Sequence, residues 1–222
     1  MVRLNITVEG QTEEAFVNQL LSPHLLAHGK LVAARRLYTS KGHRGGYTTY
    51  GKAQYDLLQW LRSEPAAWHT TLLDLYGLHH DFPGYTAATS LAGPAKAQHI
   101  EQAFQQELAQ HAPVAGWRFI PYIQLHEFEA LLFTDPTVME EWLGLNRKLA
   151  AGCFATIAAT YENPEYINDS PLTAPSKRIE ALCAGYDKVG EGLLVLEAIG
   201  LDRLRAACPH FGDWLTRLER LR

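Results

Sequence analysis

Acidic residues stand at the ends of three apolar segments, where their carboxylates could act together. Glu9 follows the first segment, Asp74 ends a later one, and Glu127 and Glu129 follow a third. Carboxylates that are brought close together repel one another and take up protons unless a hard cation keeps them ionised. Mg²⁺ or Mn²⁺ binds through such carboxylates and completes its coordination with phosphate oxygens. The acids therefore predict a divalent-metal site for a phosphate-containing substrate, centred on Glu9.

The same segments have the pattern of β-strands and alternate with helical patterns. Strands are expected at residues 3–8, 31–38, 70–76 and 117–125, and helices at 13–25, 47–62 and 96–111. Thr12 is expected to cap the first helix, and Tyr55 to face inward from the second. This alternation predicts an α/β, Rossmann-like fold with a mostly parallel sheet flanked by helices, which binds ligands at the carboxyl ends of its strands.

Length and composition are those of a globular protein. The 222 residues, 47% of them hydrophobic, suffice for one core with an appendage. Residues 1–145 are expected to form the α/β core, and residues 146–222 a helical C-terminal extension packed on or beside it. No apolar run approaches the ~20 residues that span a bilayer, and the first residues lack the pattern of a signal peptide. A cytoplasmic protein without a membrane partner is therefore expected, and an oligomer is compatible with the sequence.

Several other classes of site are excluded by missing motifs. The three cysteines form no CxxC pair, so they are expected to be structural thiols rather than zinc ligands. The segment 126–130 is not HExxH, because alanine stands in the last position. No GxxxxGK[ST], GxGxxG or GxSxG occurs, which argues against a P-loop and against a serine hydrolase.

Each acid also has an ordinary structural explanation. Glu9 could begin a turn, and Asp74 could cap the loop that follows its strand. Glu127 and Glu129 could lie in the first turn of a helix and complement its dipole. Taken singly these explanations are favoured, but the joint placement of the acids at successive strand ends favours a site.

Two short motifs resemble those of a known family. Val8-Glu9-Gly10-Gln11-Thr12-Glu13 resembles the opening motif of TOPRIM domains, in which a glutamate ends the first strand before a glycine. Leu73-Asp74-Leu75-Tyr76 resembles a degraded form of that family's second motif, Asp-x-Asp. With residues 126–133 and 173–179, the whole chain resembles a bacterial TOPRIM-like family of undefined function, similar to the nuclease subunits of phage-defence ATPase–nuclease pairs.

The resemblance implies metal-dependent phosphodiester chemistry, as in topoisomerases, primases and nucleases of the overcoming-lysogenization-defect type. It implies Mg²⁺ or Mn²⁺ as cofactor, Glu9 as general acid/base or metal ligand, and Asp74 as metal ligand. Tyr76 stands where the family has its second acid, which puts a two-metal site in doubt; Glu127, Glu129 or Asp81 are the candidates to compensate. The resemblance also implies an AAA-type ATPase partner.

Basic residues are candidates for binding the nucleic-acid backbone, although the net charge of −4 argues against binding by bulk electrostatics. Lys41 and Arg44 lie in a glycine-containing loop within the acid-free stretch 15–55, and a solvated loop is the alternative. Lys177 and Arg178 follow Pro175 at an expected helix N-terminus, where free N–H groups attract phosphate; ordinary capping is the alternative.

The sequence thus predicts divalent-metal-dependent hydrolysis of a phosphodiester in DNA or RNA, by a nuclease-like subunit of a bacterial defence system. The alternative is a non-catalytic TOPRIM-like module that docks onto an ATPase. A metal-dependent phosphatase or nucleotide-processing enzyme is a third option.

Overall fold

The computed structural model describes residues 1–40, 43–44, 49–113, 117–167 and 172–222, and the chain divides into two compact units. Unit 1 comprises Met1–Gln124 and Arg217–Arg222, and unit 2 comprises Leu125–Thr216. The domain boundary predicted after residue 145 falls inside unit 2, and as a functional boundary it stays a prediction.

Unit 1 is built on a parallel sheet in the order β2-β1-β5, with β6 and β7 both paired to β5. The strands are β1 (Val2–Val8), β2 (Lys30–Arg36), β5 (Trp68–Asp74), β6 (Phe119–Ile120) and β7 (Ile123–Gln124). A separate antiparallel hairpin consists of β3 (Tyr38–Ser40) and β4 (His43–Arg44). Together with the helices of both units, this sheet confirms the predicted fold class, a mostly parallel α/β sheet with a helical C-terminal part.

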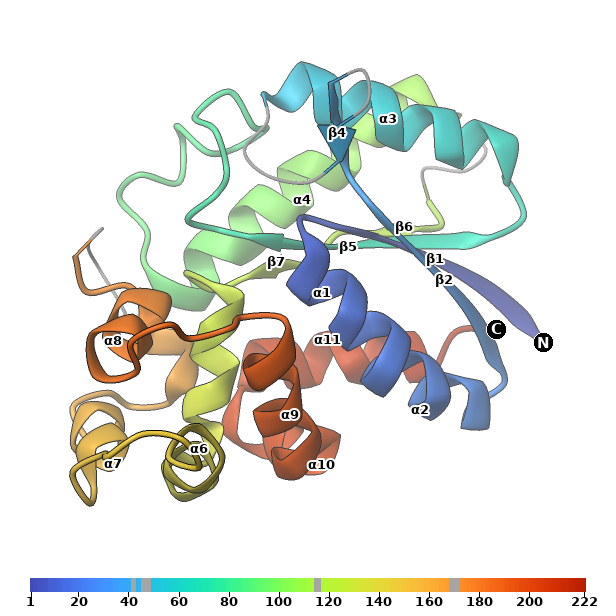
Figure 1. The fold of residues 1–222 in the computed structure, drawn as a ribbon. Coiled ribbons are helices and arrows are strands. Elements are labelled where there is room, and N and C mark those ends of the chain that lie inside the picture. The colour runs from blue at the N-terminus through green and yellow to red at the C-terminus, as the bar shows by residue number, and fades with distance from the viewer. Residues whose placement is uncertain (41–42, 45–48, 114–116, 168–171) are drawn as a thin grey trace. The chain divides into compact units, whose positions relative to one another are not determined.

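Helices cover both faces of this sheet. The helical elements of unit 1 are α1 (Gln11–Phe16), the π-helical turn η1 (Val17–Leu21), α2 (Ser22–Ala27), α3 (Tyr50–Ser63) and α4 (Gly93–His111). The helices α1 and α2 lie on one face, and α3 and α4 on the other (Figure 1). The first three elements form one continuous helix with a π turn just before Pro23, whose missing N–H removes a regular helical hydrogen bond.

The start of α1 differs from the prediction. Gly10, not Thr12, is the N-cap residue, and the Glu13 carboxylate accepts a hydrogen bond from the Gly10 backbone N–H at 2.8 Å. The expectation that Thr12 caps the helix was therefore wrong. A buried glutamate side chain satisfies the N–H group instead.

The orientation of α3 also corrects the prediction. Tyr55 is 64% exposed, whereas Ala53, Leu57 and Leu61 are buried. These three buried residues recur at intervals of four and so share one helix face, from which Tyr55 points away. The row of aliphatic residues therefore faces the core, and Tyr55 faces solvent.

The segment predicted as one strand over 117–125 forms the two short strands β6 and β7. Pro121 lies between them and has no N–H for the ladder. The Thr71 hydroxyl of β5 compensates: it donates to the Tyr122 carbonyl and accepts from the Tyr122 N–H, each at 2.9 Å. The strand therefore stays attached to β5 across the break.

Unit 2 is helical. Its elements are the 3₁₀ helices η2 (Phe128–Thr134) and η3 (Pro164–Tyr166), and α6 (Pro136–Leu143), α7 (Cys153–Ala158), α8 (Pro175–Leu182), α9 (Gly190–Ile199), α10 (Leu201–Ala207) and α11 (Pro209–Glu219), of which the last turn belongs to unit 1. Pro209 separates α10 from α11. The first turn of α11 is held by Glu165, which accepts from the His210 and Phe211 N–H groups at 2.9 Å. Burial raises the pKa of Glu165 although these N–H groups oppose the shift.

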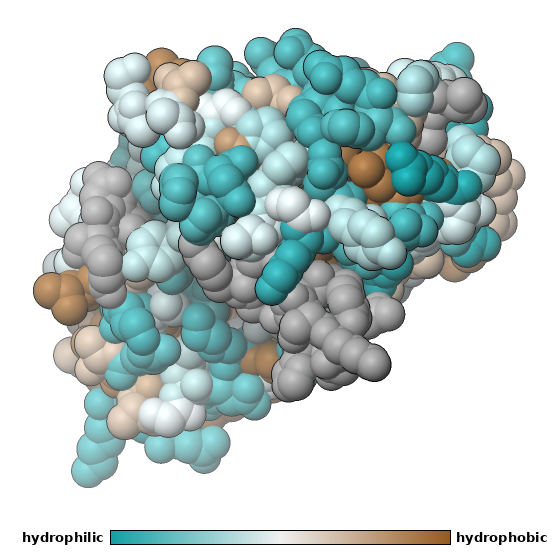
Figure 2. Space-filling view, turned by 90° about the horizontal axis from the view of Figure 1, so that it is seen from above, coloured by the Kyte–Doolittle hydropathy of each residue, from teal (hydrophilic) through white to brown (hydrophobic). Residues whose placement is uncertain are grey.

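The surface carries hydrophobic residues mainly as separate spots among hydrophilic ones when seen from above (Figure 2). Within the described ranges, no helix combines the length and the hydrophobicity needed to cross a bilayer.

The core of unit 1 offers a test of this packing. Phe104 of α4 is fully buried, with ring centroids 5.1 Å from Phe119 and 5.9 Å from Phe82. Phe104→Ala should lower the free energy of unfolding by about 3–5 kcal/mol, because it leaves a cavity among aromatic rings. The exposed Tyr55→Ala should change it by less than about 0.5 kcal/mol. Urea denaturation measures both, and a large loss in Tyr55→Ala would contradict the observed orientation of α3.

Candidate metal-binding site

Glu9 and Asp74 lie at the same edge of the sheet, at the carboxyl ends of neighbouring parallel strands. Val8 of β1 is in register with Leu72 of β5, and the Glu9 N–H donates to the Leu72 carbonyl at 3.2 Å. The Glu9 carboxylate then accepts a hydrogen bond from the Asp74 backbone N–H, also at 3.2 Å. One predicted acid is thus held directly against the backbone that carries the other.

A turn after β5 makes room for the Glu9 carboxylate. The Gly77 N–H donates to the Asp74 carbonyl at 3.1 Å and closes this turn. A Cβ atom at position 77 would lie 2.8 Å from both carboxylate oxygens of Glu9, closer than real side chains approach. A larger residue at this position would therefore force the Glu9 carboxylate to shift. Gly77 was not among the predicted site residues, although a glycine just after an acidic strand end was a usable signal.

Gln124 is a second residue that the sequence analysis missed. It pairs with Asp74 in the β5–β7 ladder, and its carbonyl accepts from the Leu75 N–H at 2.9 Å. Its side chain is buried and accepts a hydrogen bond from the Tyr122 hydroxyl at 2.7 Å. Three residues with oxygen-bearing side chains therefore lie at the carboxyl ends of β1, β5 and β7: Glu9, Asp74 and Gln124.

The donors at this edge suit a hard divalent cation. Carboxylate and amide oxygens are the ligands that Mg²⁺ and Mn²⁺ prefer. Tyr76, in the position of the second acid of the Asp-x-Asp motif, is 50% exposed and offers only a phenol. The residues present therefore fit one cation held by few protein ligands better than a fully protein-ligated pair of cations.

Glu127 and Glu129 belong to unit 2, and each has a partner there. Glu127 precedes η2 and accepts from the Ser176 N–H in the first turn of α8 at 3.0 Å. Glu129 is buried and lies 2.8 Å from the ammonium group of Lys188. Burial lowers the pKa of Lys188, but the Glu129 carboxylate outweighs this effect and leaves that pKa above its usual value. Both acids thus stabilise unit 2 internally, and a metal role for either stays a prediction.

The predicted phosphate-binding residues are only partly described. Lys41 lies outside the described residues, and of Arg44 only the backbone, in β4, is described. Lys177 pairs with Glu180 at 2.7 Å, and Arg178 donates to the Thr173 carbonyl at 2.7 Å.

The expected phosphate site at the start of α8 is already occupied by a carboxylate of the protein itself, that of Glu127. The Ser176 N–H, which a phosphate would use, donates to the Glu127 carboxylate. Binding of phosphate beside Lys177 and Arg178 therefore requires Glu127 to give up this hydrogen bond, and their role stays a prediction.

Asp81, a candidate to replace the missing second acid, is used elsewhere in unit 1. It accepts from the Tyr50 N–H at the start of α3 at 3.0 Å and pairs with His79 at 2.7 Å. Burial acts to raise the pKa of Asp81, but the Tyr50 N–H and the His79 ring outweigh it and leave the pKa below its usual value.

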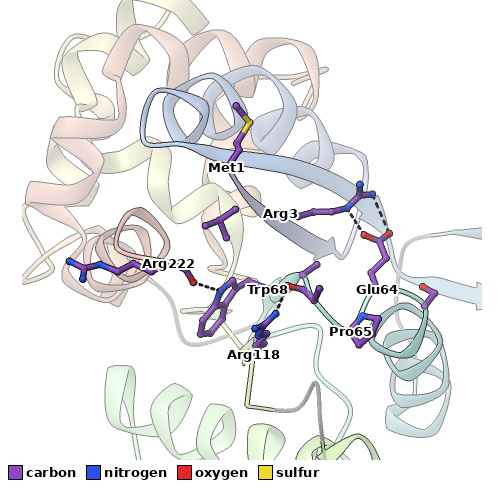
Figure 3. Close-up of a pocket in the computed structure, with 11 residues that line it drawn as sticks. Met1, Arg3, Glu64, Pro65, Trp68, Arg118 and Arg222 are labelled. Atoms are coloured by element: carbon purple, nitrogen blue, oxygen red, sulfur yellow. Dashed lines mark hydrogen bonds and ion pairs between the residues drawn. The ribbon is translucent and has the colours of Figure 1, made fainter.

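A cavity of about 580 Å³ lies at the opposite, amino edge of the sheet (Figure 3). Its polar groups contact one another: Arg3 pairs with Glu64, and the Trp68 indole donates to the Arg222 carbonyl at 3.3 Å. Size alone favours this cavity as a ligand site. Because parallel sheets bind ligands at their carboxyl ends, the Glu9–Asp74 edge is the better candidate for chemistry.

Fold and site together define an α/β protein with two acidic residues, Glu9 and Asp74, at the carboxyl edge of a parallel sheet. The chain belongs to the family described as "Domain of unknown function (DUF4276)", whose profile matches residues 8–219. This confirms the predicted membership of a family of undefined function. No curated protein matches the chain.

Two solved structures share a distant likeness with the chain. One is the C-terminal region of the Burkholderia pseudomallei OLD protein, 15% identical with a TM-score of 0.47, covering 99% of this chain and 98% of that one. The other is the same region of the Xanthomonas campestris pv. campestris OLD protein, 15% identical with a TM-score of 0.41, covering 98% of each chain.

The close approach of Gly77 to Glu9 is open to a direct test. Gly77→Ala should lower the free energy of unfolding by about 1–3 kcal/mol, because the new methyl group overlaps the Glu9 carboxylate. Glu9→Asp withdraws that carboxylate, so the double variant should regain at least about 0.5 kcal/mol relative to additivity. Urea denaturation of the four proteins measures the coupling.

Gly51→Ala is the matched control, since a Cβ there meets nothing within 4 Å. It lies in α3 and should leave stability unchanged or slightly raised. Additive effects of Glu9→Asp and Gly77→Ala would show that the two residues do not touch.

Proposed function

We propose that the carboxyl edge of the sheet binds Mg²⁺ or Mn²⁺ and hydrolyses a phosphodiester in DNA or RNA. The observation that carries this proposal is the hydrogen bond from the Asp74 N–H to the Glu9 carboxylate, which unites two acids at one edge. Purely structural caps need one carboxylate, whereas two acids on adjacent strand ends match the ligand set of a hard cation.

Glu9 and Asp74 would hold the cation. The amide oxygen of Gln124, which pairs with Asp74 in the β5–β7 ladder, is a candidate third ligand. A bound cation supplies charge stabilisation at the phosphate and positions a water molecule. The Glu9 carboxylate, oriented by the Asp74 N–H, accepts the proton of the attacking water. The new P–O bond forms as the bond to the leaving oxygen breaks, and that oxygen takes a proton from solvent.

The resemblance to nuclease subunits of defence systems extends the proposal to a partner. The chain carries no P-loop motif, so ATP hydrolysis would come from a separate AAA-type ATPase. We propose that the protein acts as the nuclease-like subunit of such a pair in the cytoplasm.

A second candidate function is a non-catalytic module that docks onto the ATPase. The observation that favours it is Tyr76, which leaves the edge without the second acid of the Asp-x-Asp motif. A module of this kind keeps the fold and the Glu9 hydrogen bond as structure but performs no hydrolysis.

Metal binding tests the roles of the two acids. Glu9→Gln and Asp74→Asn should each weaken Mn²⁺ binding about 10-fold or more, because each removes a charged ligand. Tyr76→Asp should tighten it, because the variant supplies the missing acid next to Asp74. Glu197→Gln, on the exposed side of α9, is the acidic control and should bind Mn²⁺ as the wild type does. Isothermal titration calorimetry, with labelled DNA and RNA added in parallel cleavage assays, provides the measurement.

The outcomes separate the two functions. Cleavage that is abolished in Glu9→Gln while nucleic-acid binding persists supports the enzyme, because the variant removes transition-state chemistry. Mn²⁺ binding that is equal in the wild type, Glu9→Gln and Asp74→Asn would overturn the metal site. Absence of cleavage with a stable ATPase complex would favour the docking module.

The predicted backbone-binding residues have their own test. Replacing Lys41 and Arg44 together by Ala should weaken nucleic-acid binding and flatten the salt dependence of log K. The slope should fall by roughly one unit for each phosphate that the variant no longer neutralises. Fluorescence anisotropy at several salt concentrations measures both quantities. An unchanged slope would show that these residues bind no phosphate.

A further inference from the structure

A second group of metal-type ligands lies in unit 1, beside the amino end of β2. The imidazole Nε2 of His24 is 2.6 Å from Oε1 of Glu219, and Nε2 of His28 is 4.0 Å from the same oxygen. The three prospective ligand atoms all lie within 4.8 Å of one another. The proposed phosphodiester chemistry does not use this cluster.

Local structure places the two histidines together. His24 and His28 are four residues apart at the end of α2, a spacing that puts both rings on one helix face. Their ring centroids are 4.8 Å apart. Gly29 then ends the helix with a φ of 77°, in the left-handed region that favours glycine, and Lys30 donates to the His28 carbonyl at 2.8 Å.

The carboxylate comes from the other end of the sequence. Glu219 is the last residue of α11, and residues 217–222 belong to unit 1. The Trp68 indole donates to the Arg222 carbonyl, which holds this segment on unit 1 (Figure 3). Glu219 is 11% exposed and His24 24% exposed, so two of the three ligands are partly withdrawn from water.

We propose that His24, His28 and Glu219 bind a borderline transition-metal cation, with Zn²⁺ as the reference ion. Two imidazole nitrogens and one carboxylate oxygen are a donor set of zinc sites, and three protein ligands leave a position for water. Helical histidines four residues apart supply two zinc ligands in the same way in metalloproteases. This donor set differs from the all-oxygen edge at Glu9, which suits Mg²⁺ or Mn²⁺.

The distances require only side-chain adjustment. Ligand atoms around a tetrahedral zinc ion with bonds of about 2.0–2.1 Å are about 3.3 Å apart. The distance between His24 and Glu219 must therefore open slightly, while the ring of His28 moves closer. His28 is 43% exposed at the helix end and has room to rotate.

An ordinary ion pair is the competing explanation of the short distance between His24 and Glu219. It accounts for one histidine but not for the second ring directed at the same oxygen. His111 and Glu107, which are four residues apart on α4, form a comparable histidine–glutamate pair at 3.1 Å. That pair provides a matched control, a histidine–glutamate pair without the second histidine of the proposed site.

Titration of the untagged full chain with ZnCl₂ tests the proposal. The wild type should bind one Zn²⁺ with an affinity that falls at least ~10–100-fold in His28→Gln and in Glu219→Gln, since each removes a ligand. His111→Gln should bind as the wild type does. Co²⁺ should give visible absorption bands of a low-coordinate site in the wild type and His111→Gln, and these bands should be absent from the two ligand variants.

Two further measurements keep this site apart from the one at Glu9. Glu9→Gln should retain the Zn²⁺ site, and an excess of Mg²⁺ should not displace the ion, because Mg²⁺ prefers oxygen ligands. Zn²⁺ should raise the melting temperature of the wild type but not of His28→Gln, an exposed substitution that the fold tolerates. Equal Zn²⁺ affinity in the wild type and His28→Gln, or no binding by the wild type, would overturn the proposal.

Discussion

The pairing of β1 with β5 is the constraint on which the candidate site depends. Their register brings Val8 opposite Leu72, and the backbone N–H of Glu9 continues the ladder one step beyond β1. At the next position β1 has ended and offers no backbone carbonyl to β5. The Glu9 carboxylate instead accepts the hydrogen bond from the Asp74 N–H. The carboxylate therefore satisfies a backbone donor that the end of the sheet would otherwise leave to solvent. Because this hydrogen bond is part of the sheet's own bonding, the position of Glu9 is set by the most regular part of unit 1 and not by a loop.

The parts of this arrangement that depend on local pattern could be predicted from the sequence. Alternating apolar residues indicate β1 and β5, and parallel order then implies that Glu9 and Asp74 share an edge. The parts that depend on distant partners could not. Gly77 matters only because Glu9 lies against it, and the division of β6 from β7 is tolerated only because the Thr71 hydroxyl replaces the missing backbone bond. The group around Glu219 was equally hidden, since 195 positions separate that residue from His24.

The acids of unit 2 show why strand-end position alone is a weak criterion for a metal ligand. Glu127 completes the hydrogen bonding of a helix start, and the buried carboxylate of Glu129 is compensated by the more exposed ammonium group of Lys188. A buried carboxylate without a cationic partner would be an uncompensated charge, so a metal ion at Glu129 would have to take the place of the Lys188 ammonium group. Between these acids and β7 lies His126, the one non-glycine residue with positive φ among the described residues, at 60°. That conformation costs about 1–2 kcal/mol, which the neighbouring contacts must offset.

The Glu9 edge offers few protein ligands, and this small number affects how a cation would be held there. With two carboxylates and one amide oxygen available, most of an octahedral shell must come from water and substrate phosphate. Affinity for the cation and for the substrate are then coupled, since each supplies ligands or charge to the other. The nitrogen-containing site at His24 and His28 carries no such requirement, because a three-ligand zinc site needs only water to be complete. A chelator would therefore act on this protein in two separable ways. Under the proposed function, loss of a cation from the Glu9 edge would remove the chemistry while the sheet keeps its hydrogen bonds. Loss of a cation from the proposed second site would instead leave α2 and residues 217–222 joined by the direct contact between His24 and Glu219.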